Sequence, residues 1–169
     1  MTARLHGLIF PGALVERGFW LYVWVAVTAE GAELLYVGRT GDSSSVNAQS
    51  PYIRMGQHLG SNESTNMLRT HLEKLGVSPI SCKSFELVSY GPILPEGKNK
   101  AEHYSRRDKI AALEKKLSDS LHEAGYAVLN CVNCRKELDP ELWREVRAAF
   151  AERFTRLCES AEAAATGEL

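Results

Sequence analysis

No apolar stretch in this 169-residue chain is long enough to cross a bilayer. The longest one near the N-terminus, residues 8–15, is interrupted by Pro11 and Gly12 and lacks a small-residue cleavage site. Cysteine is scarce, and four residues do not make a disulfide framework, so we expect a reducing, cytoplasmic compartment. Membrane, collagen-like, disordered and disulfide-rich secreted classes are therefore excluded.

A strong excess of charge of one sign is also lacking. Twenty basic residues stand against 21 acidic ones, which argues against nucleic-acid binding through bulk charge. The charge is nevertheless uneven, because residues 98–116 carry seven Lys or Arg and three acids, a net charge of +4. From residue 137 onward, eight acids and four arginines give −4. A local basic surface in the middle of the chain stays compatible with this composition.

Several common catalytic motifs are missing. The segment Gly38-Arg39-Thr40-Gly41 follows a predicted strand, but no Gly-Lys-Ser/Thr comes after it, so a phosphate-binding P-loop is not supported. The chain contains neither a Gly-x-Ser-x-Gly elbow nor a His-Glu-x-x-His pair. Serine-hydrolase and zincin chemistry therefore have no support in the sequence.

What the chain does contain is an alternation of strand and helix signals, typical of one α/β domain with a C-terminal helix. Strands are predicted at 19–28, 34–38 and 85–90, the first two forming a hairpin, and residues 91–97 are predicted to be a loop. Helices are predicted at 51–59, 64–75 and 100–123, and from 139–141 with an apolar face that continues to Ala161.

A set of polar residues lies where these elements should be buried. Arg54 and His58 are four residues apart and share one face of a short helix. Glu114 borders the apolar stripe of the long helix, and a carboxylate there needs a cation or a basic partner. Tyr22 and Tyr36 come from neighbouring strands and can present two phenols together. An arginine for phosphate, a carboxylate for a divalent ion and a phenol or imidazole for the proton suit phosphodiester hydrolysis.

At these residues the sequence resembles the GIY-YIG nuclease superfamily. The matching segments, in the family's order, are Trp20-Leu21-Tyr22, Tyr36-Val37-Gly38 followed by Arg39-Thr40, Tyr52 to His58, and Glu114 to Asn130. The first of them matches only at its tyrosine, since Trp20 replaces the usual glycine, which alters how closely a backbone or substrate can approach this strand. The resemblance implies a small, mostly antiparallel three-stranded sheet flanked by helices.

The resemblance also implies a role for each matched residue. Tyr22 acts as the general base or orients the attacking water, Tyr36 supports it by hydrogen bonding, and His58 assists Tyr22 or a phosphate oxygen. Arg54 stabilises the transition-state phosphate, Glu114 ligates one Mg²⁺ or Mn²⁺, and Asn130 braces the site. A phenol has an ordinary pKa of about 10, so lowering that of Tyr22 to near 8 requires about 2.7 kcal/mol of local electrostatics. We expect Arg54, the metal and a neutral His58 to supply it.

The function that follows is metal-dependent endonucleolytic hydrolysis, with DNA as the expected substrate. The expected organisation is an extension at 1–18, a nuclease domain at 19–135 and a C-terminal helix with an acidic tail at 136–169. The residues expected to contact nucleic acid are basic: Arg39, Lys98, Lys100, Arg106, Arg107 and Lys109. Specificity must come from loops or from a protein partner, and double-strand cleavage by one site per chain favours a homodimer.

Alternatives stay open for each feature. The tyrosines also suit ordinary amphipathic strands, Arg54 and His58 a solvated helix face, and Glu114 a surface ion pair with Lys109. The same fold can serve as a non-catalytic module that binds nucleic acid or protein. A third alternative is an interaction domain stabilised by zinc at Cys131 and Cys134, although the remaining cysteines are isolated in the sequence.

Overall fold

The computed structural model describes residues 3–43, 45–62 and 65–158. At its centre lies an antiparallel sheet in the order β2-β1-β3, formed by β1 (Phe19–Val27), β2 (Glu33–Arg39) and β3 (Ser84–Leu94). The helices are α1 (Pro51–Leu59), α2 (Met67–Lys74), α3 (Lys100–Glu123) and α4 (Pro140–Ala151), with short 3-10 turns at Gly12–Val15 and Pro79–Ser81. The expected class, a small antiparallel sheet of three strands flanked by helices, is confirmed.

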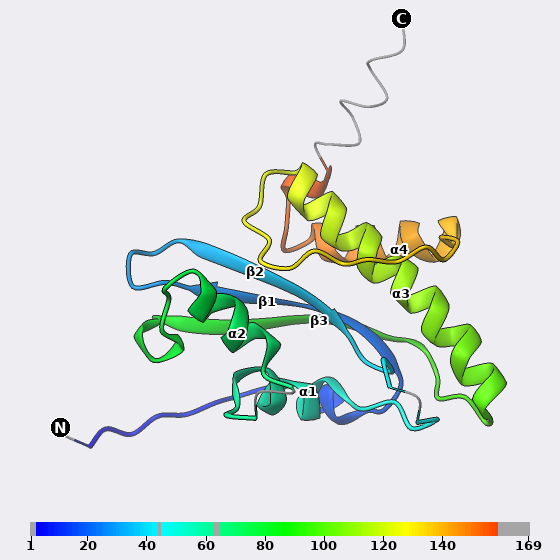
Figure 1. Cartoon of the computed structure of the whole chain (residues 1–169), viewed down its shortest axis with the longest axis horizontal. Helices are drawn as coiled ribbons and strands as arrows, with labels where there is room; N and C mark the ends of the chain where they lie inside the picture. The colour runs from blue at the N-terminus through cyan, green and yellow to red at the C-terminus, as the bar shows by residue number, and fades with distance from the viewer. Residues whose placement is uncertain (1–2, 44, 63–64, 159–169) are drawn as a thin grey trace, which may run out of the picture.

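The central strand β1 is buried on both faces. Its odd-numbered side chains, Leu21, Val23 and Val25, pack in one apolar cluster with residues of α3 and α4. Its even-numbered ones, Tyr22, Trp24 and Ala26, pack in a second cluster with residues of α2. Figure 1 shows α3 and α4 on one side of the sheet and α1 and α2 on the other. A strand covered on both faces reads as a continuous apolar run, as residues 19–28 do.

The hairpin register brings the two tyrosines of the matched motifs together. Tyr22 pairs with Gly38, and Trp24 pairs with Tyr36, in the antiparallel β1–β2 ladder. Side chains of residues separated by two positions share one face of a strand. Tyr22 and Tyr36 are therefore diagonal neighbours on the face that α1 and α2 cover.

Helices α1 and α3 carry the remaining site residues. α1 has the predicted bounds, with proline at its first turn, although the Ser50 side chain makes no capping hydrogen bond. α3 also has the predicted bounds, and its first turn is capped by Asn99, whose side chain accepts from the Glu102 N–H. The stripe Ile110, Leu113, Leu117 and Leu121 is fully buried. No helix among the described residues is both long enough and apolar enough to cross a membrane.

Two predicted boundaries in this part of the chain are wrong by several residues. α2 begins at Met67 rather than at Ser64, which lies outside the described residues. β3 continues through Gly91 and Pro92 to Leu94, because a proline without an N–H is tolerated on an edge strand. The predicted loop at 91–97 therefore starts only after Leu94.

The C-terminal helix is shorter than its apolar pattern. α4 begins after the capping residue Asp139, as predicted, but ends at Ala151, while Ala161 lies outside the described residues. Phe154 and Leu157 follow the helix and are still fully buried in the cluster that holds Val146 and Phe150. The pattern thus predicted burial correctly and helix length wrongly. The apolar face of this segment is covered by the chain's own core.

Candidate functional site

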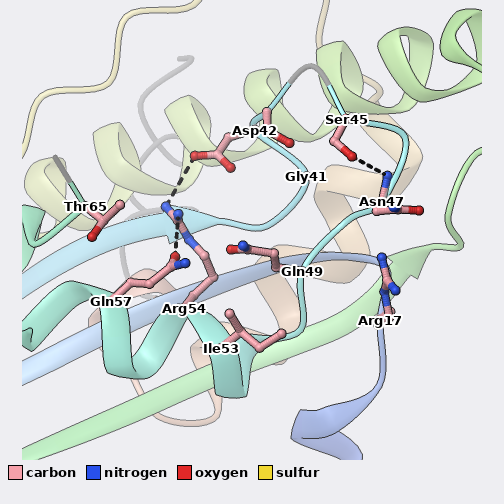
Figure 2. Close-up of a pocket in the computed structure, with 11 residues that line it drawn as sticks. Arg17, Gly41, Asp42, Ser45, Asn47, Gln49, Ile53, Arg54, Gln57 and Thr65 are labelled. Carbon is pink, nitrogen blue, oxygen red and sulfur yellow. Dashed lines mark hydrogen bonds and ion pairs between the residues drawn. The ribbon is translucent and has the colours of Figure 1, made fainter. Parts of the chain in front are cut away.

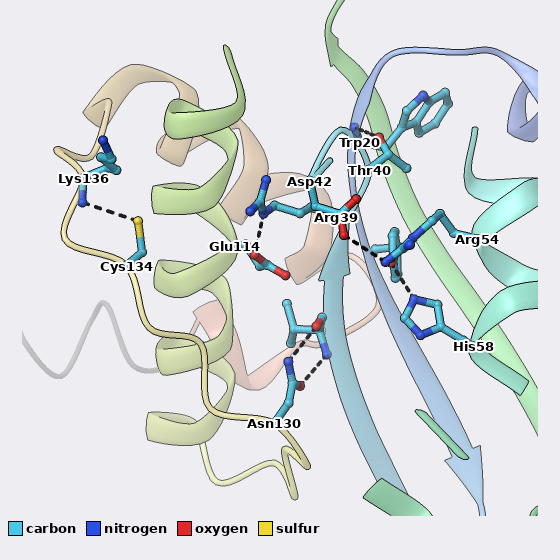
Figure 3. Close-up of polar contacts among 12 residues, drawn as sticks. Trp20, Arg39, Thr40, Asp42, Arg54, His58, Glu114, Asn130, Cys134 and Lys136 are labelled. Atoms are coloured by element: carbon cyan, nitrogen blue, oxygen red, sulfur yellow. Dashed lines mark hydrogen bonds and ion pairs between the residues drawn. The ribbon is translucent and has the colours of Figure 1, made fainter. Parts of the chain in front are cut away.

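Tyr22, Arg54 and His58 form one hydrogen-bonded group. The Tyr22 hydroxyl lies 2.7 Å from His58 Nε2, and Arg54 Nε donates to the same hydroxyl at 3.4 Å. His58 is fully buried and Tyr22 is 1% exposed. Helix α1 supplies the arginine and the histidine from adjacent turns (Figure 3). Strand β1 supplies the phenol. A solvated helix face, the alternative for Arg54 and His58, is therefore wrong.

Burial controls protonation in this group. It raises the pKa of the Tyr22 phenol well above its ordinary value of 10, although the Arg54 guanidinium acts in the opposite direction. Burial, with the charge of Arg54, lowers the pKa of His58 to about 3. At neutral pH Tyr22 therefore keeps its proton and His58 is neutral. Desolvation thus outweighs the arginine, and the expected lowering of the Tyr22 pKa to near 8 would depend on the metal as well as on Arg54 and His58.

Tyr36 completes the aromatic part of the site. Its ring centre lies 5.0 Å from that of His58 and 5.6 Å from that of His71 on α2. Burial first, and then the charge of Glu114, raise the pKa of the Tyr36 phenol. This hydroxyl is therefore a hydrogen-bond donor at neutral pH. His71 could not be predicted as a site residue, because its only sequence signal is its position on a short predicted helix.

Glu114 forms an ion pair with Arg39, whereas the alternative of a surface ion pair required Lys109 as its partner. Arg39 Nε donates to Glu114 Oε2 at 2.8 Å, and the two side chains are 17% and 15% exposed. Lys109 instead pairs with Asp139. Burial raises the pKa of Glu114 more strongly than Arg39 lowers it, and the charge of Asp42 adds to the rise. Glu114 therefore lies in a poorly solvated position where a nearby cation stabilises its charged form.

The donor chemistry of this place fits a magnesium or manganese ion. Mg²⁺ is usually held by one or two carboxylates, with substrate phosphates and water completing its shell. Glu114 and Asp42 supply two carboxylates whose charges act on one another. Within the described ranges, no three His, Cys, Asp or Glu side chains gather into a group that could hold a metal by themselves. A cation here would depend on substrate oxygens as well as on the protein.

Arg54 also lines an open polar cleft of about 580 Å³ beside the loop that follows β2. Figure 2 shows its guanidinium between Asp42 and Gln57, which it contacts at 3.3 Å and 3.0 Å. The remaining lining is mainly polar: Arg17, Ser43, Ser45, Asn47, Gln49 and Thr65, with Gly41 and Ile53. Asp42 and Gln57 were not predicted from the sequence, although Gln57 follows Arg54 by three residues on the same helix.

Asn130 joins the segment after α3 to β2. Its side-chain oxygen accepts from the Val37 N–H at 2.9 Å, and its amide donates to the Val37 carbonyl at 2.8 Å (Figure 3). Nearby, Leu35 forms an isolated parallel bridge with Val128. Asn130 thus holds the backbone between Tyr36 and Gly38. It acts on the site through this backbone, as a bracing residue would.

The basic residues expected to contact nucleic acid differ in their surroundings. Arg39 is largely buried against Glu114, and Arg106, Arg107 and Lys109 each contact an acidic side chain, namely Glu102, Asp108 and Asp139. Lys98 and Lys100 are exposed, and neither side chain pairs with an acid in the part of the chain that the structure describes. These two lysines are therefore exposed charges of the basic segment without an acidic partner among the described residues.

The cysteines and Trp20 bear on the alternatives. Cys131 and Cys134 are unpaired in the loop before α4, and Cys82 and Cys158 are also free. Trp20, the residue in place of the family's glycine, is 3% exposed and packs against Gly91 of β3, where an added Cβ would meet its ring at 2.8 Å. The bulk of Trp20 is therefore accommodated by a glycine on the neighbouring strand.

Comparisons with known families, with curated proteins and with solved structures gave no match. The assignment of a function consequently depends on the chemistry and the placement of the residues described above.

Proposed function

We propose that this protein is a metal-dependent endonuclease of the GIY-YIG type that hydrolyses phosphodiester bonds, with DNA as its substrate. One observation carries the proposal: Tyr22 of β1 makes direct contacts with Arg54 and His58 of α1, which lie 32 and 36 positions later in the sequence, and the charge of the largely buried Glu114 extends to this phenol. A purely structural sheet gains little from burying a phenol, a guanidinium, an imidazole and a carboxylate together, because each loses hydration. Buried ionisable groups with shifted pKa values are concentrated at functional sites.

In the proposed reaction Arg54 binds the scissile phosphate. Its side chain is 16% exposed, faces the open cleft and is oriented by Gln57 and Asp42. A guanidinium presents several N–H donors in one plane and can contact two phosphate oxygens at once. Attack at phosphorus increases the negative charge on these oxygens, so the contact becomes stronger in the transition state than in the ground state.

Tyr22 and His58 handle the proton of the attacking water. The water oxygen forms a bond to phosphorus and loses a proton to the Tyr22 oxygen, while the Tyr22 proton passes to His58 Nε2, 2.7 Å away. The bond between phosphorus and the departing oxygen breaks at the same time, and its electron pair leaves with that oxygen. His58 is neutral at neutral pH, so its Nε2 lone pair is available for this proton, and the negative charge that develops on the phosphate offsets the cost that burial and Arg54 place on a charged imidazole. The raised pKa of Tyr22 makes a concerted transfer the lower-energy route, since a free phenolate would be costly in this buried place.

The other residues position charge around the phosphate. Tyr36, protonated at neutral pH, donates a hydrogen bond to a phosphate oxygen or to the water. Glu114 would hold the divalent cation, which when bound neutralises charge that develops on the departing oxygen. Asn130 keeps the β2 backbone in place through its two hydrogen bonds to Val37.

A non-catalytic nucleic-acid-binding module is the second candidate. It is favoured by one observation, that both phenols are protonated and Glu114 is already neutralised by Arg39. Incubation with plasmid, single-stranded and branched DNA, in Mg²⁺ or in EDTA, separates the two. Cleavage that requires Mg²⁺ supports the endonuclease, whereas binding without cleavage of every substrate supports the module. We also propose a cytoplasmic location, for which the low cysteine content is the argument.

A further inference from the structure

Four charged side chains of the site are partnered in two ion pairs. Arg39 pairs with Glu114 at 2.8 Å, and Arg54 pairs with Asp42 at 3.3 Å. Figure 3 shows Asp42 between the two arginines. The electrostatic influence of Asp42 and of Arg54 extends to Glu114, so the four groups behave as one cluster. Two positive and two negative charges leave this cluster neutral.

This arrangement blocks both ligands of the proposed reaction. The carboxylates that would take a cation are held by guanidinium groups, and the guanidinium that would take a phosphate is held by a carboxylate. Arg39 is moreover only partly satisfied: its Nη1 is buried and has no hydrogen-bond partner among the described residues. A buried donor without a partner costs free energy, which an incoming phosphate oxygen would recover.

We infer that the two ion pairs exchange partners when substrate binds: Glu114 and Asp42 turn to the divalent cation, and Arg39 and Arg54 turn to the phosphate. The inference depends on the proposed function and adds two roles to it. Asp42 becomes a second carboxylate for the cation, and Arg39 becomes a phosphate-binding residue that occupies the Glu114 carboxylate until substrate arrives.

The exchange makes the two ligands cooperative. A cation that binds alone takes Glu114 from Arg39 and leaves a largely buried guanidinium without a counter-charge, which is costly. A phosphate that binds alone leaves the carboxylates unpaired in the same way. When both bind, each arginine and each carboxylate has an opposite charge beside it. Cation and DNA therefore each raise the affinity of the site for the other, by the same factor.

Two binding measurements test the exchange. Binding of Mn²⁺ to the protein alone is followed by electron paramagnetic resonance, and binding of a fluorescent DNA duplex is followed by anisotropy, in Mn²⁺ or in EDTA at constant ionic strength. The DNA measurements use the Tyr22→Phe background, so that the duplex stays intact. We expect Mn²⁺ to tighten DNA binding about 10-fold, within the usual range for coupled sites. A coupling of less than about 2-fold would overturn the inference.

Variants separate partner exchange from a simple bridge in which the cation merely touches protein and phosphate. Arg39→Gln should bind Mn²⁺ about 10-fold more tightly than the parent and lose most of the coupling, because no guanidinium competes for Glu114. Asp42→Asn should show opposite signs in the two assays: weaker Mn²⁺ binding, and tighter DNA binding in EDTA, because Arg54 is released. A simple bridge predicts unchanged coupling in Arg39→Gln, and that result contradicts the exchange.

Asp42 is 43% exposed, so Asp42→Asn should fold, and it still tests the exchange if Arg39→Gln does not fold. Arg153→Gln is the matched control, because Arg153 is also held by two carboxylates, Glu33 and Glu86, but lies outside the site. It should change neither affinity. A parent protein that binds no Mn²⁺ even in the presence of DNA contradicts the proposed function together with the inference. Mn²⁺-dependent cleavage without coupling contradicts the inference alone.

Discussion

The ring of Tyr22 lies against the backbone of Gly38, its cross-strand partner. A Cβ added at Gly38 would come within 2.5 Å of the Tyr22 ring and 2.7 Å of its hydroxyl oxygen. Tyr22 is fully buried and bonded to His58, so it cannot move aside freely. Glycine is thus required at position 38 because the Tyr22 phenol occupies the space that a side chain would need, and not because the backbone adopts an unusual angle.

Replacing this glycine should displace the phenol. We expect Gly38→Ala to lower the free energy of unfolding by about 1–3 kcal/mol, as overpacking of a core does, and to reduce cleavage strongly. Gly56→Ala is the matched control, because nothing lies within 4 Å of a Cβ at this helical position. This control should be neutral or stabilising by about 0.5–1 kcal/mol. Urea denaturation of both variants measures the difference, and equal stability would contradict the steric argument.

Removing the Tyr22 hydroxyl should separate chemistry from folding. Tyr22→Phe keeps the packed ring but leaves His58 Nε2 without its 2.7 Å partner. Turnover should fall about 10²-fold or more, as expected for loss of a proton-transfer group, while the protein stays folded. Tyr126→Phe, on the opposite side of the sheet, should keep the parent rate. Cleavage kinetics with plasmid DNA measure both, and a Tyr22→Phe variant with the parent's rate would exclude a role of this phenol in catalysis.

Replacing Glu114 should abolish Mg²⁺-dependent cleavage without abolishing DNA binding. Glu114→Gln removes the negative charge and leaves Arg39 largely buried without a counter-ion. We therefore expect a loss of about 1–3 kcal/mol in stability and DNA affinity that is unchanged or higher. Glu123→Gln, near the end of the same helix, is the control. Parent-level cleavage by Glu114→Gln would place the cation elsewhere, with Glu102 as the next carboxylate to test.

The low pKa of His58 makes stability depend on pH. The ordinary pKa of histidine is near 6.5 in the unfolded chain, whereas that of buried His58 is about 3, so the unfolded chain binds the extra proton between these values. Stability should therefore fall as pH drops, by about 2 kcal/mol between pH 7 and pH 5 from this residue alone. His71, whose pKa is also lowered by burial, acts in the same direction.

The contribution of His58 is isolated by difference. Urea denaturation at both pH values should show a smaller loss of stability in His58→Gln than in the parent. His122→Gln, at the exposed last turn of α3, should keep the parent's dependence. Parallel curves for the parent and His58→Gln would mean that this imidazole takes up its proton equally readily in the folded and the unfolded protein.

The exposed lysines before and at the start of α3 should contribute most to the salt dependence of DNA binding. Each neutralised phosphate contributes about −0.9 to the slope of log K against log salt on duplex DNA, so about four contacts give a slope near −3 to −4. Replacing Lys98 and Lys100 together by Ala should flatten the slope by about two units. Lys83→Ala, beside the β1–β2 turn, should leave it unchanged. A parent slope near zero would remove the basic segment from the binding surface.

Local signals in the sequence were sufficient for the bounds of α1 and α3. Proline at position 51 marks a helix start, and a glycine after α3 marks its end, because these preferences arise within one turn of backbone. The end of β3 could not be predicted in this way. Whether Pro92 interrupts a strand depends on whether that strand lies at the edge of the sheet, and the edge is decided by the topology.

The candidate site shows the same division. Tyr22, Arg54 and His58 were identifiable by residue type and spacing, but the Arg39–Glu114 ion pair was not. Arg39 is an odd number of positions from Tyr36 on β2, so alternation places it on the opposite face, toward α3. The odd or even spacing along a strand predicts which face of the sheet a side chain is on. Its partner on that face depends on how α3 is rotated against the sheet. The contact of Asp42 with Arg54 likewise depends on the course of a loop.

The two hydrogen bonds between Asn130 and Val37 join residues 93 positions apart. During synthesis, Tyr22, Tyr36, Arg54 and His58 leave the ribosome long before this amide exists. These hydrogen bonds to β2 can form only after α3 and the segment that follows it have emerged. A nascent or prematurely terminated chain therefore carries the phenols and the arginine without the hydrogen bonds that hold β2 in place. Assembly of the candidate site is thereby delayed until most of the polypeptide has been made.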